Sequence, residues 1–209
     1  MHIILVRHGA TDWNLEGRCQ GSSDRDLSEL GMRQAEQISG LLRNENIHAI
    51  YSSNLRRARR TAEAISRPHG LPVLIEDGIH ELDHGELEGL TFNEIKAQYG
   101  DFLTRWRSEP ADLHVPGGER LTDVAARAWN SFNEIVGRHR AGERILVVSH
   151  NFPILGIVCR ISGTHLNAYR TFHLDPCGIT RIDRDDQLGW TLTHVNSREY
   201  PAQLVTPPR

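Results

Sequence analysis

Two short apolar runs of the sequence lead directly to a histidine. Residues 3–6 precede Arg7 and His8, and residues 145–148 precede His150 by one serine. Continuous apolar runs of this length are typical of strands buried on both faces of a parallel sheet. Ligands of open α/β sheets bind beyond the carboxyl ends of the strands. If these two strands are neighbours, their histidines converge on one point.

Positive charge gathers at the same predicted edge. Arg7 stands beside His8, and residues 56–60, which are rich in arginine, open a helix after a third apolar run. A helix that begins just after His150 would add free backbone N–H groups and the positive end of its dipole. Guanidinium groups match phosphate oxygens. Two histidines, two arginines and a helix terminus around one anion predict phosphoryl transfer.

The elements that position these residues alternate between strand and helix. Apolar runs at 3–6, 49–51 and 145–148 predict strands, and apolar spacing predicts helices over 28–42, 55–65 and 121–136. Ser28 is the predicted N-cap of the first helix. Pro153 falls where the first turn of a further helix tolerates a missing N–H. The alternation predicts an α/β fold, a three-layer α/β/α sandwich with a mostly parallel central sheet.

The segment from about 78 to 120 departs from this pattern. Glycines and prolines bracket a helical stretch around 92–106, which predicts a small helical lid inserted over the sheet. We expect a single domain over residues 1–199. Residues 200–209 contain three prolines and form a Pro-rich tail that is predicted to be extended or disordered.

Bulk composition limits the classes of protein. The 209 residues can bury a core without a metal or disulfide. The net charge of -3 argues against a nucleic-acid partner. The first apolar run is too short for a signal peptide or a membrane span. Cys19, Cys159 and Cys177 show no paired spacing, which favours free thiols in a reducing cytoplasm.

Five blocks of the sequence resemble the histidine phosphatase superfamily, in its phosphoglycerate mutase-like branch. They occur in the order of that family and together span residues 3–195. The blocks are LVRHGATDWN at 5–14 with the glycines and glutamine of 17–21, YSSNLRRARRTA at 51–62, residues 81–89, PGGE at 116–119 and VSH at 148–150. The RHG triplet alone would be weak evidence for this family, whereas five blocks in the same order and register are specific for it.

The resemblance implies roles for individual residues. His8 would be the nucleophile that becomes phosphorylated, and Arg7, Arg57 and His150 would bind the phosphoryl group. Glu81 would protonate the leaving oxygen and then activate water. The attacking imidazole has to be neutral, with its other N–H held by a backbone acceptor near Gly9. No metal or other cofactor is required. Further substrate contacts are implied for Asn14, Gln20, Gly21 and Ser22.

Two positions differ from the common family pattern. Asn151 follows His150 where many members have glycine, and its backbone N–H or side-chain amide is expected to contact substrate. His84 stands where others often carry an aromatic or apolar residue. With a histidine at this position, the sequence resembles the metal-independent phosphoserine phosphatases of the family. The competing interpretation is a surface histidine in a loop.

Residues 80–84 read H-E-x-x-H, the sequence mark of zinc metalloproteases. That motif works only when both histidines lie one turn apart on a helix. Gly78 before it, and Gly85 and Gly89 after it, argue against a sustained helix. A zinc hydrolase is therefore disfavoured.

The resemblance itself raises two competing functions. Cofactor-dependent phosphoglycerate mutases carry longer insertions with extra basic residues, whereas residues 88–116 contain only Lys96, Arg105 and Arg107. A non-catalytic binding protein is disfavoured because every expected catalytic residue is present. We therefore predict a cytoplasmic phosphatase of small phosphomonoesters such as phosphoserine, phosphoglycerate or α-ribazole phosphate. The resemblance leaves a homodimer open.

Overall fold

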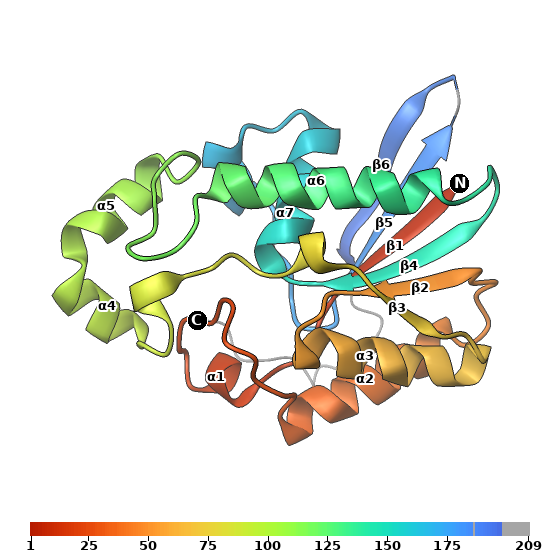
Figure 1. Ribbon diagram of the computed structural model, residues 1–209, viewed down its shortest axis with the longest axis horizontal. Coiled ribbons are helices and arrows are strands. Elements are labelled where there is room, and N and C mark those ends of the chain that lie inside the picture. The colour runs from red at the N-terminus through yellow and green to blue at the C-terminus, as the bar shows by residue number, and fades with distance from the viewer. Residues whose placement is uncertain (186, 198–209) are drawn as a thin grey trace.

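The computed structural model describes residues 1–185 and 187–197, which form a six-stranded mixed sheet in the order β3-β2-β4-β1-β5-β6 (Figure 1). The first four of these strands are parallel to one another, while β5 and β6 run antiparallel as a hairpin. The strands are β1 (His2–Arg7), β2 (Ala49–Ser52), β3 (Val73–Ile75), β4 (Arg144–Ser149), β5 (Ile179–Asp185) and β6 (Gly189–Ser197).

The two strands that precede the histidines are neighbours, which meets the condition for their histidines to converge. Strands β1 and β4 pair in parallel, with Val6 opposite Val148 and Arg7 opposite Ser149. The backbone N–H of His8 continues the ladder by donating to the carbonyl of Ser149 at 3.0 Å. The register therefore delivers the two histidines to the same point of the sheet edge.

Helices cover both faces of the sheet, so the predicted three-layer sandwich is confirmed. Helices α2 (Glu29–Leu42) and α3 (Arg56–Ser66) lie on one face, and α6 (Leu121–Gly137) and α7 (Asn151–Ser162) lie on the other (Figure 1). Residues along β1 alternate between two cores: Ile4 and Val6 join the α2–α3 side, while neighbouring Ile3 and Leu5 join the α6–α7 side.

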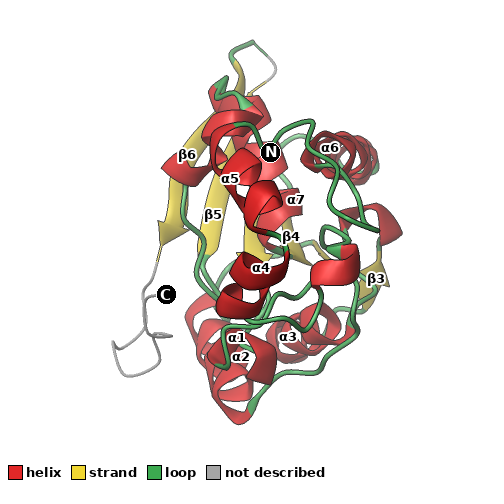
Figure 2. Cartoon of the chain, turned by 90° about the vertical axis from the view of Figure 1, so that its left-hand side faces the viewer, coloured by secondary structure: helices red, strands yellow, loops and turns green. Residues whose placement is uncertain are grey.

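The segment between β3 and α6 extends beyond the carboxyl ends of the parallel strands (Figures 1 and 2). It contains short 3-10 turns η2 (Asp77–Ile79) and η3 (Gly85–Leu87), then α4 (Phe92–Gln98) and α5 (Gly100–Ser108). The sequence predicts one helical stretch there, but Tyr99 divides it with a non-helical backbone (φ -128, ψ 37).

The remaining elements are short. They are α1 (Asp12–Leu15) and the 3-10 turns η1 (Arg67–His69) and η4 (Leu166–Thr171). The sequence pattern does not predict strands β3, β5 and β6. The predicted tail at 200–209 lies outside the described residues. Among the helices that are described, none has the length and apolar character needed to cross a bilayer.

Candidate functional site

His8 is held by the backbone in one tautomer. Its side chain is buried, and its Nδ1 lies 2.7 Å from the carbonyl oxygen of Gly9, the predicted backbone acceptor. Nδ1 therefore carries the proton, and Nε2 keeps the lone pair toward which Arg57 Nε points at 3.3 Å. Burial, followed by the charges of Arg57 and Arg7, lowers the pKa of His8 well below its ordinary value.

His150 faces His8 across the same edge. The two ring centroids lie 5.0 Å apart. His150 Nε2 lies 2.8 Å from the hydroxyl of Ser53, whereas its buried Nδ1 has no hydrogen-bond partner among the residues that the structure describes. Burial first, and then the charge of Arg57, lowers the pKa of His150 well below its ordinary value. Its Nδ1 is thus a buried polar atom available to a bound oxygen.

Two arginines supply the positive charge. Arg57 stands in the first turn of α3 and is completely buried. Burial lowers its pKa to about 10, against the opposing effect of nearby carboxylates, so it remains charged at neutral pH. Arg7 is held by a 2.6 Å hydrogen bond from its Nη1 to the carbonyl of Leu174. Its charge also acts on both histidines, which places it beside them.

Arg57 additionally organises the loop after α1. Its Nη2 donates to the carbonyl of Gly21 at 2.7 Å, and its Nη1 donates to the carbonyl of Ser23 at 2.9 Å. Gly21 is required there because a Cβ would lie 2.4 Å from the carbonyl of Leu82. Of the predicted contact residues of this loop, Gly21 is therefore bonded directly to Arg57.

Glu88 holds the other side of that loop. One carboxylate oxygen accepts from the N–H and hydroxyl of Ser22 at 2.6 and 3.0 Å, and the other accepts from the N–H (2.8 Å) and hydroxyl of Ser23. Burial raises the pKa of Glu88, but these hydrogen bonds outweigh it and leave the pKa below its ordinary value. The sequence does not single out Glu88, which is one acid among several in a loop.

The remaining predicted contact residues of this region are held by local bonds. Asn14 forms a capping box with Thr11: its Oδ1 accepts from the Thr11 N–H at 3.0 Å. The Thr11 hydroxyl donates to Gln20 Oε1 at 2.6 Å. Within the described part of the chain, the buried Nε2 of Gln20 has no hydrogen-bond partner. Gln20 thus presents an unused donor, whereas Asn14 also shapes the loop.

The side chain of Glu81 accepts hydrogen bonds from the N-terminus of α7. This contact corrects the role that the sequence predicts for that helix. Its Oε1 accepts the N–H groups of Leu82 (2.9 Å) and Phe152 (3.0 Å), and its Oε2 accepts the N–H of Asn151 (3.0 Å). The sequence predicts that the helix terminus offers its N–H groups to the substrate anion. The side-chain oxygens of Glu81 accept the N–H groups of Asn151 and Phe152 instead, which satisfies donors that a buried helix N-terminus would otherwise leave unpaired.

His84 lies beside Glu81 rather than on the open surface. Its ring meets that of Phe152 edge to face, with 5.5 Å between centroids. Burial lowers its pKa although the carboxylates of Glu81, Glu88 and Asp83 act in the opposite direction. The side chain is half-buried against Phe152, so it is not a fully solvated loop histidine.

The H-E-x-x-H string is not helical, in agreement with the sequence prediction. Residues 80–84 lie between the 3-10 turns η2 and η3. His80 Nδ1 bonds to the carbonyl of Asp77 at 2.6 Å, while His84 faces Phe152. The two imidazoles are thus engaged in different places and not presented from successive helical turns.

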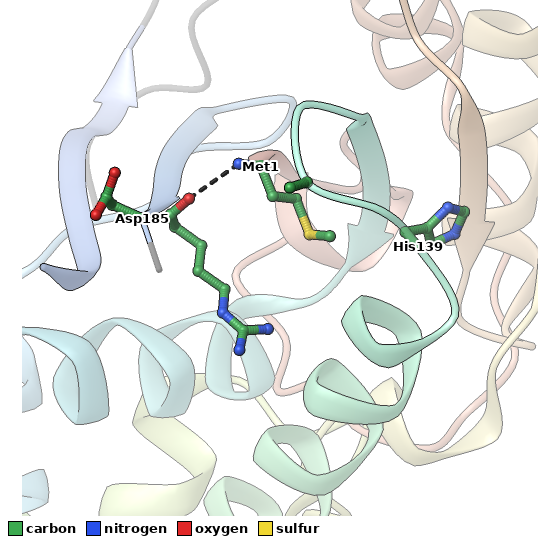
Figure 3. A pocket seen from close by; sticks show the side chains of 5 residues that line it. Met1, His139 and Asp185 are labelled. Carbon is green, nitrogen blue, oxygen red and sulfur yellow. Dashed lines mark hydrogen bonds between the residues drawn. The ribbon is translucent and has the colours of Figure 1, made fainter. Parts of the chain in front are cut away.

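A pocket opens at the opposite end of the sheet, where the parallel strands begin (Figure 3). It is lined by Met1, His139, Ala141, Arg184 and Asp185. Both imidazole nitrogens of His139 have partners: Nε2 lies 3.0 Å from the Tyr51 hydroxyl, and Nδ1 lies 2.8 Å from a carboxylate oxygen of Glu143. This pocket is therefore not a second copy of the histidine site.

Comparisons with known proteins agree with the geometry. The model of the histidine phosphatase superfamily (branch 1) matches residues 3–198. Phosphoserine phosphatase 1 of Hydrogenobacter thermophilus is 36% identical over 185 residues, which cover 88% of this chain and 87% of that protein. A probable phosphoglycerate mutase GpmB of Cronobacter sakazakii is 34% identical over 183 residues, covering 88% and 85%.

A solved structure extends the comparison to three dimensions. The mycobacterial glucosyl-3-phosphoglycerate phosphatase, determined in complex with VO3, superposes with a TM-score of 0.86 at 28% identity. The match covers 94% of this chain and 99% of that one. Together with the arrangement of His8, Arg57 and His150, these matches establish that the chain belongs to the histidine phosphatase superfamily.

Proposed function

We propose that the chain is a phosphatase that transfers the phosphoryl group of a small phosphomonoester first to His8 and then to water. The observation that carries this proposal is the state of the His8 ring. Gly9 fixes the proton on Nδ1, and a lowered pKa keeps Nε2 unprotonated beside the charged Arg57. A neutral buried imidazole beside a guanidinium is suited to attack a bound phosphoryl group.

In the first step, Nε2 of His8 attacks phosphorus and the bond from phosphorus to the leaving oxygen breaks. Arg7, Arg57 and Nδ1 of His150 surround the transferring group and stabilise its charge. Among the described residues, Glu81 Oε2 accepts one hydrogen bond, so this oxygen has the capacity to carry the proton that passes to the leaving oxygen.

In the second step, water replaces the departed alcohol. Glu81, now a carboxylate, takes a proton from water as its oxygen attacks phosphorus, and the bond between phosphorus and Nε2 of His8 breaks. Inorganic phosphate leaves, and both side chains return to their starting protonation states. No metal enters this scheme, because the arginines supply the positive charge.

The substrate class that we propose is a small phosphomonoester of the phosphoserine, phosphoglycerate or α-ribazole phosphate kind. Gln20 Nε2 is a buried donor suited to a polar group of such a substrate, and His84 lies beside Glu81. The relatives include phosphatases named for phosphoserine and glucosyl-3-phosphoglycerate. We further propose that Ser22 and Asn151 border the bound molecule.

A mutase is the second candidate, because a relative carries that name. The phosphatase is favoured since the lysine and arginine side chains of residues 88–116, Lys96, Arg105 and Arg107, are all exposed. A mutase needs basic groups that hold a second acidic group of its substrate inside the pocket.

A kinetic screen tests the choice. Purified protein is incubated with O-phosphoserine, 3-phosphoglycerate and α-ribazole phosphate, and kcat/KM is measured from released inorganic phosphate. We expect phosphate release from at least one of them with saturable kinetics. Movement of phosphate between glycerate positions without release would replace the phosphatase by the mutase, and no reaction with any of the three would contradict the substrate class.

A further inference from the structure

Arg127 of α6 holds the backbone that carries Glu81. Its Nη1 donates to the carbonyls of Gly78 at 3.0 Å and His80 at 2.6 Å, and its Nη2 donates to the carbonyl of Glu81 itself at 2.8 Å. The planar guanidinium thus satisfies three carbonyls of one short segment from fixed directions, whereas an ammonium group is a compact point charge without that fixed geometry.

Glu119 fixes Arg127 in this orientation. The guanidinium Nε and Nη2 donate to its two carboxylate oxygens at 3.1 and 3.0 Å. The side chains are only 19% and 26% exposed, so solvent screens the pair less than it screens a surface ion pair. Burial raises the pKa of Glu119, but the hydrogen bonds from Arg127 and from the N–H of Asp83 outweigh it and leave the pKa below its ordinary value.

Glu119 also holds the far side of Glu81. Its Oε2 accepts the N–H of Asp83 at 3.0 Å, and its own N–H donates to the carbonyl of Asp83 at 3.0 Å. The backbone on both sides of Glu81 is therefore attached to one charged pair. On the strand side, the hydroxyl of Ser149 donates to the carbonyl of Ile79 at 2.7 Å.

The attachment of this backbone to Arg127 and Glu119 affects how accurately a proton donor at Glu81 is placed. The carboxyl group of Glu81 is placed between the N-terminus of α7 and its own main chain, and its main chain has no helix or strand to define it. A displacement of about 1 Å from the productive geometry costs on the order of a hundredfold in rate. The direction of the carboxyl group therefore depends on what holds residues 78–83.

We propose that Arg127 and Glu119 are a positioning pair that aims the carboxyl group of Glu81 at the leaving oxygen. Neither is assigned a contact with substrate. This inference rests on the proposed role of Glu81 as the general acid, and it predicts that damage to the pair appears as damage to proton transfer.

The test uses two substrates with different needs for a proton. The variants Arg127→Lys, Arg127→Met and Glu119→Gln are compared with wild type on 4-nitrophenyl phosphate and on the alkyl phosphomonoester with the highest kcat/KM. We expect kcat/KM for the alkyl substrate to fall about tenfold to a hundredfold in Arg127→Met, and less in the two milder variants. The aryl substrate needs little protonation on departure and should lose about threefold or less.

Arg138→Met is the matched control. Arg138 follows the same helix and donates to the side chain of Glu76 at 3.1 Å, which precedes the segment of residues 78–83. Its kcat/KM on both substrates should stay within about twofold of wild type. Thermal unfolding identifies variants that are damaged in folding, and Arg127→Lys and Glu119→Gln retain hydrogen-bonding groups if Arg127→Met does not fold.

A double-mutant cycle separates this inference from the proposed function. In a Glu81→Gln background, Arg127→Lys or Arg127→Met should cost little further activity toward the alkyl substrate, because the group being positioned is already inactive. Equal losses on both substrates, or losses that multiply in the cycle, would overturn the positioning role. If Glu81→Gln alone spared the alkyl substrate, the proposed function of Glu81 would fail instead.

Discussion

The two ends of the sheet contain similar residues and differ in what those residues are bonded to. The carboxyl end has His8, His150 and arginines, and the amino end has His139 with Arg184 beside the pocket of Figure 3. His139 is bonded at both nitrogens, to a tyrosine hydroxyl and a carboxylate. At the carboxyl end, the backbone fixes Nδ1 of His8 and leaves its Nε2 facing a buried guanidinium.

The difference shows that residue type alone does not make a phosphoryl-transfer site. Strand direction delivers His8 and His150 to one point, and burial keeps both neutral. At the amino end, the carboxylate of Glu143 bonds Nδ1 of His139, and Asp185 lines the pocket beside Arg184. A pocket with a histidine and an arginine is therefore unsuited to phosphate when its own acids already neutralise the charge.

The largest expected effect separates the two ends directly. His8→Ala should lower kcat by about four orders of magnitude or more, because it removes the proposed nucleophile. His139→Ala, the matched change at the amino end, should leave kcat/KM within about twofold. Both are measured by phosphate release. Substantial activity in His8→Ala would remove the distinction between the two ends.

The next effect tests the proposed proton donor of the carboxyl end, Glu81. Glu81→Gln keeps the size of the side chain but cannot donate an acidic proton, so kcat/KM for an alkyl phosphomonoester should fall about a hundredfold or more. The loss on 4-nitrophenyl phosphate should be much smaller. If the two substrates lose activity equally, Glu81 is not the acid for the leaving group.

Arg57→Lys tests whether the site needs the several N–H donors of a buried guanidinium group or only a positive charge. Lysine cannot bond His8, the Gly21 carbonyl and the Ser23 carbonyl together, so the loop of residues 20–23 should loosen. We expect kcat/KM to fall about a hundredfold with a raised KM, measured by steady-state kinetics. A change confined to kcat would instead mean that Arg57 stabilises the transition state and contributes little to substrate binding.

Much of this arrangement can be predicted from the sequence. The apolar runs before His8 and His150 indicate two buried parallel strands, and the Ser28 N-cap marks the start of α2 correctly. The acceptor at Gly9 follows from the chemistry that a neutral nucleophile requires. These features depend on local pattern or on the reaction itself, which is why a single sequence carries them.

The features that escape prediction depend on tertiary contacts that leave no local pattern. Strand β3 has three residues, and the hairpin of β5 and β6 is partly exposed and polar. Arg127 looks like an ordinary charged residue of a helix surface until Glu119 and the carbonyls of residues 78–81 surround it. The pattern assigns the N–H groups at the start of α7 to substrate because their partner, Glu81, is 70 residues away in sequence.

The pH dependence of stability provides a smaller effect that sharpens the comparison. The folded state keeps His8 and His150 neutral with lowered pKa values, whereas the unfolded chain protonates them near their ordinary pKa of about 6.5. The unfolded state then binds more protons, so the free energy of unfolding falls as pH decreases below about 6.5, by at most about 1.4 kcal/mol per pH unit for each histidine.

Denaturant unfolding at pH 7.5 and 5.5 measures this effect above the range in which carboxylates titrate. The variant with both His8→Asn and His150→Asn should lose less stability between the two pH values than wild type does. An unchanged loss in that double variant would mean that the buried pair is not the source of the pH dependence.

The smallest effect belongs to the amino end. His139→Ala removes the partners of Tyr51 and Glu143 and should lower the free energy of unfolding by about 1 kcal/mol, with activity retained. Urea unfolding monitored by tryptophan fluorescence gives the value. A loss of activity with unchanged stability would reverse the roles that we assign to the two ends.

The central claim is tested most directly by trapping the intermediate. Enzyme is mixed with a phosphomonoester carrying labelled phosphate, quenched in alkali within the first turnover, and digested for mass spectrometry. The account predicts one phosphoryl group on His8, labile in acid and stable in alkali, with none on the His8→Ala protein. Label on another residue, or phosphate release in the first turnover with no phosphoenzyme at any quench time, would contradict it.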